Sequence, residues 1–104
     1  MNTLPLSGVV ITLNEADKIA RCLDSLSFCE DLVVVDSGSS DGTIELAESM
    51  GARVIHHDWC GFGKQKQFAV EQAATDWVLC LDADEWLSDE LKNSVSSLLV
   101  TTPQ

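Results

Sequence analysis

Basic residues are scarce in this chain of 104 residues, which has 6 Lys and Arg against 17 Asp and Glu. The formal net charge of −11 argues against nonspecific nucleic-acid binding, because such binding needs a basic surface. It also argues against adhesion of this segment to anionic lipid. A phosphorylated ligand would therefore need a metal ion or a few well-placed cations in order to bind.

Long apolar runs are missing as well, since no stretch reaches the ~18 residues of a membrane span. Residues 1–8 have neither the basic flank nor the continuous apolar region of a signal peptide, and no repeat or low-complexity segment follows. The length fits one small domain that buries roughly 65 % of its unfolded surface. We therefore expect a cytoplasmic protein with a single domain over residues 1–104.

Metal-ligand spacing is absent among the cysteines, which are Cys22, Cys29, Cys60 and Cys80. Their positions in the hydrophobic pattern favour reduced, mostly buried thiols over disulfides. The group at residues 56–60, with two histidines, an aspartate and a cysteine, fits no common zinc spacing. We therefore expect neither a disulfide framework nor a zinc centre.

The most informative stretch is an apolar run, residues 77–81, that leads directly into Asp82-Ala83-Asp84-Glu85. Such a run is typical of a strand buried on both faces of a parallel sheet. Alternation would place Asp82 and Asp84 on one side, where carboxylates ~4 Å apart repel by about 4 kcal/mol at an effective dielectric near 20. A shared proton or a divalent cation would relieve this repulsion. We expect Mg²⁺ or Mn²⁺ carrying a phosphorylated substrate; the alternative is a solvated turn before a helix that Ser88 begins.

The hydrophobic pattern alternates between strands and helices along the chain. Strands are predicted at about residues 9–13, 32–35, 54–55 and 77–81, and helices at about 15–26, 44–50, 64–74 and 88–99. Asn14 is the predicted N-cap of the first helix, with Asp17 in a weaker form of the capping box, and Gly51 ends the second helix. This alternation predicts an α/β fold with a parallel sheet and right-handed crossovers.

Three polar segments follow predicted strands: residues 13–15, 36–41 and 82–85. The carboxyl ends of parallel strands share one edge of a sheet, and ligands of doubly wound folds bind at that edge. The convergence of all three segments predicts a ligand site there more strongly than any one of them does.

The same segments resemble a known family. Residues 11–15 (Ile-Thr-Leu-Asn-Glu), 33–43 (Val-Val-Val-Asp-Ser-Gly-Ser-Ser-Asp-Gly-Thr) and 81–85 (Leu-Asp-Ala-Asp-Glu) resemble the N-terminal half of family 2 glycosyltransferases with the GT-A fold. The resemblance implies a Rossmann-like nucleotide-sugar-binding half, truncated at its C-terminus, with about four parallel strands in the order 3-2-1-4 and flanking helices. Residues 57–67 and the Asp-Ala-Asp-Glu segment are most similar to bacterial lipopolysaccharide or lipooligosaccharide core β-1,4-glucosyltransferases.

By this resemblance the protein is an inverting, metal-dependent enzyme that transfers a hexose, with glucose expected, from a UDP-sugar to a bacterial cell-surface glycan such as lipopolysaccharide core. Mn²⁺ or Mg²⁺ is the implied cofactor, because a UDP leaving group develops negative charge. The general base and the site for the saccharide or lipid-linked acceptor belong to the later half of the family's domain, so no catalytic residue is assigned here. We expect weak donor binding without transfer, and for the full-length enzyme peripheral association with the cytoplasmic face of the inner membrane.

The resemblance also implies a set of donor-binding residues: Thr12, Leu13, Asn14, Glu15, Asp36, Ser37, Gly38, Lys64, Asp82, Ala83 and Asp84. Residues 12–15 would border the nucleoside, and Asp36 would accept a hydrogen bond from the uracil imide N–H. Asp82 and Asp84 match the Asp-X-Asp motif, which meets the ribose and, through the metal ion, the diphosphate. Lys64, with Lys66 as a second candidate, would supply a cation for phosphate.

The chain departs from the family pattern at single positions. The usual Pro and Tyr of the first segment are absent between Ile11 and Leu13, which leaves the stacking surface for the base unassigned. Ser37 replaces a second Asp, and Gln67 stands where many members have Asn.

Other interpretations stay open for several residues. Asn14 and Asp17 could do no more than cap a helix, residues 41–42 could be a turn, residues 59–62 could pack under their loop, and the two lysines could be surface charges. For the whole chain, the alternatives are a haloacid-dehalogenase-like phosphatase and a non-catalytic module that binds nucleotide or a partner protein. In the expected strand order, residues 77–81 form an exposed edge, which predicts self-association.

Overall fold

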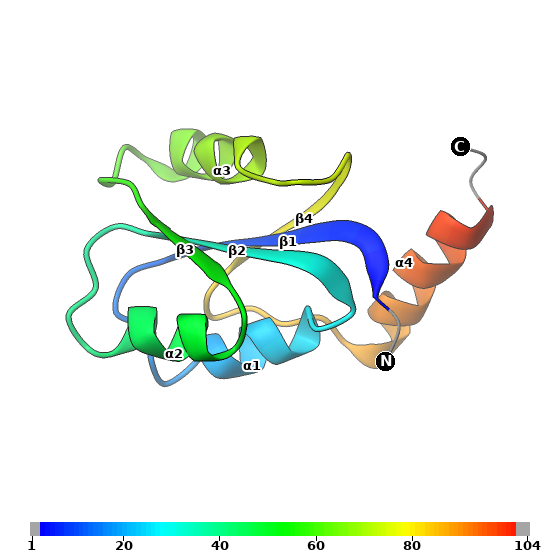
Figure 1. Cartoon of the computed structure of the whole chain (residues 1–104), viewed down its shortest axis with the longest axis horizontal. Helices are drawn as coiled ribbons and strands as arrows, with labels where there is room; N and C mark the ends of the chain where they lie inside the picture. Colours follow the sequence, from blue (N-terminus) through cyan, green and yellow to red (C-terminus); the bar gives the residue numbers. More distant parts are fainter. Residues whose placement is uncertain (1–2, 102–104) are drawn as a thin grey trace.

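In the computed structural model, which describes residues 3–101, four parallel strands form one sheet with helices on both faces (Figure 1). The strands are β1 (Leu4–Thr12), β2 (Cys29–Asp36), β3 (Arg53–His56) and β4 (Trp77–Asp82). The helices are α1 (Ile19–Ser25), α2 (Thr43–Ser49), α3 (Phe62–Glu71) and α4 (Asp89–Thr101). The strand order β3-β2-β1-β4 confirms the predicted topology.

The core has two layers because successive residues of β1 and β2 face opposite sides of the sheet. Val10 and Val34 pack with α1 and with Ala47 of α2, while Val9 and Val33 pack with Ala69 of α3. Figure 1 shows α1 and α2 below the sheet and α3 above it. The continuous Val-rich runs are therefore explained by burial on both faces.

The register brings the carboxyl ends of the strands together at one edge of the sheet. Thr12 of β1 pairs with Asp36 of β2, Asp36 pairs with His56 of β3, and Ile11 pairs with Asp82 of β4. The polar segments after β1, β2 and β4 thus meet at this edge, as the sequence predicted.

The start of α1 was predicted wrongly. The helix begins at Ile19, its N-cap is Lys18, and no side chain caps it. Asn14 instead adopts a left-handed conformation, with φ of 53°, and its side chain bonds to the loop after β2. Residues 15–18 therefore form a turn and not the first turn of a helix.

Two other helix ends follow the sequence signals. Gly51 has φ of 91°, and the N–H groups of Gly51 and Ala52 donate to the carbonyls of Glu48 and Ala47. This paired bonding is the Schellman arrangement that a glycine after a helix favours. At α4, the hydroxyl of Ser88 accepts a hydrogen bond of 3.1 Å from the N–H of Leu91, as expected for a capping serine.

Strand β4 is less buried than its apolar sequence predicted. Trp77 is 40 % exposed, and the residues after it are half-buried. β4 pairs with β1 alone among the described strands, so it lies at the end of the sheet. An apolar strand with one unpaired side is consistent with the predicted exposed edge.

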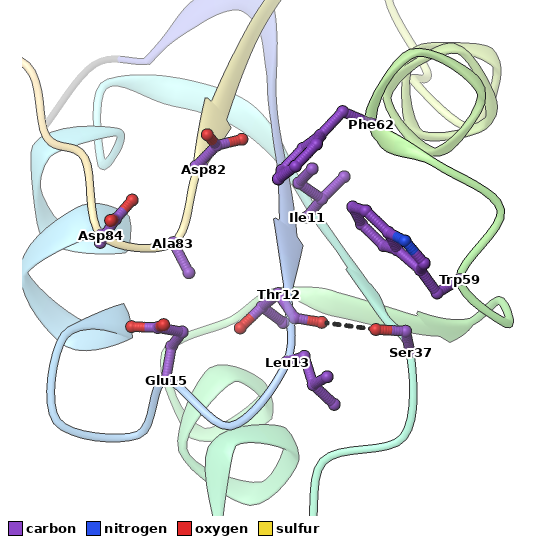
Figure 2. Close-up of a pocket in the computed structure, with 10 residues that line it drawn as sticks. All are labelled: Ile11, Thr12, Leu13, Glu15, Ser37, Trp59, Phe62, Asp82, Ala83 and Asp84. Atoms are coloured by element: carbon purple, nitrogen blue, oxygen red, sulfur yellow. Dashed lines mark hydrogen bonds between the residues drawn. The ribbon is translucent and has the colours of Figure 1, made fainter.

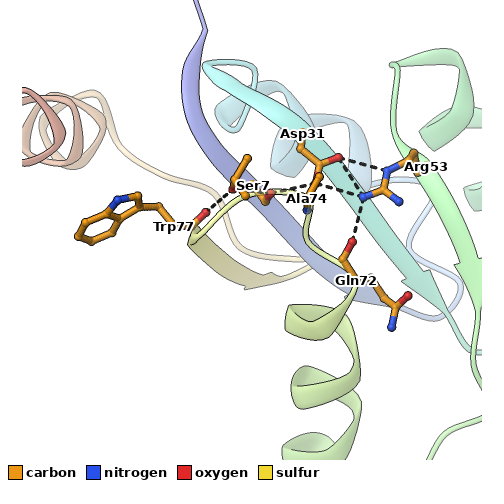
Figure 3. Close-up of polar contacts among 7 residues, drawn as sticks. Ser7, Asp31, Arg53, Gln72, Ala74 and Trp77 are labelled. Atoms are coloured by element: carbon orange, nitrogen blue, oxygen red, sulfur yellow. Dashed lines mark hydrogen bonds and ion pairs between the residues drawn. The ribbon is translucent and has the colours of Figure 1, made fainter. Parts of the chain in front are cut away.

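A group of polar residues lies where the strands begin, at the end of the sheet opposite to the carboxyl ends (Figure 3). We call it the Asp31 cluster, and it links the segment before β4 to residues near the start of the other strands. Its members are Ser7, Asp31, Arg53, Gln72, Ala74 and Thr75. Asp31 accepts hydrogen bonds from Ser7 Oγ and from the N–H of Ala74, both at 2.9 Å, and a bidentate pair from Arg53. Burial alone would raise the pKa of Asp31, but these hydrogen bonds and the Arg53 charge outweigh it and hold the pKa below its usual range.

Candidate functional site

A cleft of about 390 Å³ opens at the carboxyl edge of the sheet (Figure 2). Most of the predicted donor-binding residues line it, namely Thr12, Leu13, Glu15, Ser37, Asp82, Ala83 and Asp84. The predicted residues Asn14, Asp36, Gly38 and Lys64 do not, and Ile11, Trp59 and Phe62 line it without having been assigned from the sequence. The three polar segments therefore meet at one cleft, as predicted, although the residues that line the cleft are not all the predicted ones.

The acidic turn, residues 82–85, forms one wall of this cleft. The N–H of Glu85 donates to the Asp82 carbonyl at 2.9 Å, and a Glu85 carboxylate oxygen accepts from the N–H of Asp82 at 2.7 Å. Ala83 between the two aspartates is buried and its N–H donates to the Ile11 carbonyl, while Asp84 is exposed. These bonds turn the chain tightly at the strand end, and Asp82 and Asp84 both stay at the cleft (Figure 2).

Two oxygens at the cleft lack partners. Among the side chains that the structure describes, those of residues 3–96, the buried oxygens without a hydrogen bond are Thr12 Oγ1 and Asp82 Oδ1, and both residues line the cleft. An unsatisfied buried polar group costs about 1–3 kcal/mol, so such groups usually mark a ligand, ion or water. The Nζ of Lys66 lies 3.4 Å from Asp82 Oδ1, which balances charge without forming a hydrogen bond.

Burial and the carboxylates of the acidic turn together raise the pKa of a nearby thiol, that of Cys22. Burial raises the pKa of the Cys22 thiol to about 12, and the carboxylates of Glu85, Asp84 and Asp82 add to the rise. The thiol lies 3.8 Å from the Asp82 carbonyl oxygen. The turn therefore produces a negative potential that favours a cation.

The donor set fits a divalent ion only in part. Within the described residues, no group of three or more His, Cys, Asp or Glu side chains is arranged to hold a metal ion. Mg²⁺, however, is commonly bound by one or two carboxylates, with substrate phosphates and water completing its shell. Asp82, whose Oδ1 has no hydrogen bond, and Asp84 could hold an ion in this way.

Asp36 does not offer its carboxylate to the cleft. Its side chain is fully buried, one oxygen accepts from the N–H groups of Gly38 and Ser39 at 2.9 and 2.8 Å, and the other accepts from the Ser39 hydroxyl. The next residue, Ser37, lines the cleft and donates from Oγ to the Thr12 carbonyl at 3.3 Å. The carboxylate thus shapes the loop after β2, and the residue beside it reaches the site.

The loops after β1 and β2 are joined by hydrogen bonds. Asn14 donates from its N–H to Ser39 Oγ and accepts from the N–H of Ser40, both at 2.8 Å. Further along, the N–H of Glu15 donates to Thr43 Oγ1 at 3.0 Å, and that of Ala16 donates to Asp41 at 3.1 Å. Asn14 therefore acts through the loop geometry, and residues 41–42 form the turn into α2 that was the alternative interpretation.

Trp59 and Phe62 form the wall opposite the acidic turn. Their rings meet edge to face with centroids 4.8 Å apart, and they are 51 % and 63 % exposed. Gln65, which is buried, donates to the His57 carbonyl at 3.0 Å and so holds the loop that carries them. The rings face the cleft and do not pack under their loop (Figure 2). The sequence signal for this wall was a pair of aromatic residues on either side of Gly61, with Trp59 in the loop before α3 and Phe62 at the first position of the helix.

The basic residues of α3 are placed differently from each other. Neither lysine lines the cleft. Lys64 is exposed in the first turn of α3, whereas Lys66 forms the ion pair with Asp82. Lys66, the second candidate from the sequence, is therefore the lysine that lies near the acidic turn, and its predicted role at phosphate stays a prediction.

Comparison with known proteins decides the family. The sequence matches the family described as Glycosyl transferase family 2 over residues 7–99. The chain belongs to glycosyltransferase family 2. It is 40 % identical over 106 aligned positions to the lipopolysaccharide core biosynthesis glycosyltransferase LpsC of Rhizobium meliloti (strain 1021), covering 97 % of the chain and 39 % of that protein.

Solved structures share the fold. Mannosyl-3-phosphoglycerate synthase from Rubrobacter xylanophilus matches with a TM-score of 0.75 and 26 % identity, covering 94 % of the chain and 37 % of that structure. Glucosyl-3-phosphoglycerate synthase from Mycobacterium tuberculosis, solved with Mn²⁺, UDP and phosphoglyceric acid, matches with a TM-score of 0.72 and 29 % identity, covering 94 % of the chain and 39 % of that structure. The chain thus spans well under half of the length of LpsC and of each of these two structures.

These findings confirm the predicted family and GT-A-like topology, and they decide against the phosphatase alternative. In the part of the glycosyltransferase chain that is described, no helix is both long and apolar enough to cross a membrane.

Proposed function

We propose that this chain is the donor-binding half of a metal-dependent hexosyltransferase and that the cleft binds a UDP-sugar. The observation that carries the proposal is the pairing of two unsatisfied oxygens, Thr12 Oγ1 and Asp82 Oδ1, at one cleft beside a second carboxylate, Asp84. The solved relative with UDP and Mn²⁺ supports this ligand class.

The two ends of the cleft would bind different parts of the donor. The aromatic rings of Trp59 and Phe62 and the polar groups of Thr12 and Ser37 suit the nucleoside, because exposed aromatic faces stack on bases. The acidic turn would hold the diphosphate through Mn²⁺ or Mg²⁺. Asp36 would act by holding Ser37 in position and not by touching the base.

The chemistry requires charge compensation at the diphosphate. A bound divalent ion would stabilise the negative charge that develops on the leaving UDP. Asp82 and Asp84 would hold that ion, while the bonds of the acidic turn to β1 would fix their positions beforehand. We assign no general base within these residues.

The wider assignment also belongs to this proposal. The similarity to the lipopolysaccharide core biosynthesis glycosyltransferase LpsC favours a bacterial glycan such as lipopolysaccharide core as acceptor. We also infer, from the resemblance of the sequence alone, transfer of glucose or another hexose with inversion. We expect the 104-residue chain to bind the donor weakly and to transfer no sugar. Robust transfer from radiolabelled UDP-glucose by this chain alone would contradict that expectation.

The proposal is tested by calorimetric titration of UDP with and without Mn²⁺. We expect Mn²⁺ to tighten UDP binding, and Asp82→Asn and Asp84→Asn to remove that gain. Glu48→Gln is the matched control, because Glu48 is an exposed carboxylate on α2 away from the cleft and its loss changes the charge equally. A nucleotide-binding module without the metal function would bind UDP equally well with and without Mn²⁺.

A further inference from the structure

The ion pair between Lys66 and Asp82 raises a question about the same site. Nζ lies 3.4 Å from Asp82 Oδ1, the oxygen that is buried and has no hydrogen bond. The side chains of Lys66 and Asp82 remain 42 % and 33 % exposed. Lys66 is therefore the charge partner of an otherwise unsatisfied oxygen, and it is exposed enough to move.

A lysine and a divalent ion compete for that oxygen, because two cations on one oxygen lie close together and repel. Asp82 Oδ1 is buried, it has no hydrogen bond within the described chain, and the Lys66 ammonium is its charge partner. A metal ion that binds this oxygen therefore displaces the ammonium of Lys66.

We propose that Lys66 and the divalent ion alternate at Asp82, so that metal ion and UDP-sugar bind as a coupled pair. This inference rests on the proposed function. In the ligand-free protein, Lys66 balances Asp82 and holds metal affinity down. When metal ion and diphosphate arrive together, Lys66 leaves Asp82 and its ammonium contacts a phosphate oxygen.

The geometry of α3 allows this exchange. The helix starts immediately after the loop that carries Trp59, and it packs on the face of the sheet above β1 and β4 (Figure 1). Lys66 is not among the residues that line the cleft, but it reaches Asp82 from α3, with Nζ 3.4 Å from Oδ1, and its side chain is 42 % exposed. Its flexible four-carbon side chain can change partner without movement of the backbone.

The exchange predicts that replacing Lys66 changes the affinity for Mn²⁺ and the affinity for UDP in opposite directions. Lys66→Gln should tighten binding of Mn²⁺ alone by about fivefold, because the competing ion pair is gone. It should weaken UDP binding in the presence of Mn²⁺ by about tenfold, because a charge-assisted contact to phosphate is lost. Linkage then requires that the mutual enhancement between Mn²⁺ and UDP falls.

The experiment measures Mn²⁺ binding by electron paramagnetic resonance, first with Mn²⁺ alone and then at saturating UDP, on the complete 104-residue chain. Lys92→Gln is the matched control, because it removes the same charge from another ion pair of 3.4 Å, with Asp89 on α4. Lys66→Arg keeps the positive charge and should resemble the wild type. Circular dichroism checks that every variant is folded.

The outcomes separate this inference from the proposed function. If wild-type protein binds UDP with Mn²⁺ but Lys66→Gln has the same affinity for Mn²⁺ alone as Lys92→Gln, the exchange at Asp82 is wrong and the donor site stands. If wild-type protein shows no UDP binding that depends on Mn²⁺, both proposals are wrong. Tighter binding of Mn²⁺ alone together with weaker binding of UDP supports the exchange.

Discussion

Replacing Asp31 by Asn should lower the free energy of unfolding, although Asp31 does not line the cleft. Asp31 accepts hydrogen bonds from Ser7, Ala74 and Arg53, and its side chain is only 12 % exposed. Asparagine has nearly the same shape, but its NH₂ group would face donors in place of one carboxylate oxygen. Ser7 and Ala74 donate to the same carboxylate oxygen, so the amide oxygen of asparagine can keep these two bonds, but only without the negative charge, and its NH₂ group then faces the donors of Arg53.

The magnitude follows from the burial of each partner. A buried hydrogen bond contributes about 1.5–3 kcal/mol when its acceptor is charged and about 0.5–1.5 kcal/mol when it is neutral, so loss of the charge costs about 1 kcal/mol for each of the bonds from Ser7 and Ala74. The Arg53 side chain is 51 % exposed, so its share is discounted to about 0–1 kcal/mol. We expect a loss of about 2–3 kcal/mol, a large part of the roughly 5–15 kcal/mol typical of a domain of this size.

Urea unfolding followed by circular dichroism measures this loss at pH 7. A loss of this size lowers the midpoint by roughly 1–2 M urea. The control is Glu30→Gln, an exposed carboxylate on the same strand with the same change of charge. If Asp31→Asn costs no more than Glu30→Gln, the hydrogen bonds of the Asp31 cluster do not stabilise the fold and the reasoning is wrong.

The pH dependence gives a second check on the same residue. Because the pKa of Asp31 is lowered in the folded state, its contribution is fully present above the unfolded pKa of about 3.9 and is lost as the pH falls through the folded value. The difference between wild type and Asp31→Asn should therefore be constant from pH 7 to about 5 and shrink below about pH 4. A difference that stays constant down to pH 2 would contradict the assignment.

Three other predictions test separate parts of the molecule. Burial and nearby carboxylates raise the pKa of Cys22 to about 12, so iodoacetamide at pH 8 should label the exposed Cys60 and not Cys22. Mass spectrometry of digests measures the labelling, and equal labelling of both cysteines would contradict the prediction. A Cβ at Gly8 would lie 3.0 Å from Leu26 Cδ1, so Gly8→Val should lower the free energy of unfolding, measured in urea, by about 1–3 kcal/mol. An unchanged midpoint would contradict this, because it would mean that Leu26 moves aside at little cost. The unpaired edge of β4 predicts self-association at high concentration, which sedimentation velocity measures, and Trp77→Lys should reduce it; a monomer at every concentration would refute the prediction.

The order and type of the elements could be predicted because local patterns and tertiary packing agree. The Val-rich runs of β1 and β2 are buried on both faces, and Gly51 ends α2 where a left-handed residue is required. The start of α1 could not be predicted in the same way. Asn14 carries a good capping side chain, but contacts with Ser39 and Ser40, distant in sequence, hold it in another conformation.

The site was predicted at the level of segments and less well at single residues. Asp82 and Asp84 stand at the cleft because a strand end and a tight turn fix them locally. Asp36 and Ser37 are adjacent, and which of them is buried depends on how the loop closes on its own carboxylate. Lys66 of α3 forms an ion pair with Asp82 at the end of β4. This contact depends on how the helix packs against the sheet, which no local pattern in the sequence predicts.

The acidic turn is anchored at both sides of its exposed middle. On one side the N–H of Ala83 donates to the Ile11 carbonyl, and on the other the N–H of Leu87 donates to the buried Ser25 hydroxyl at 3.0 Å. The side chains between these anchors are exposed but have contacts: Asp84 lines the cleft, the Glu85 carboxylate accepts from the N–H of Asp82, and the Trp86 ring lies under the Arg21 guanidinium, 3.6 Å from its ring centroid. Because both anchors use the backbone N–H groups of Ala83 and Leu87, substitutions of the exposed side chains between them should leave the path of the chain at the sheet edge unchanged.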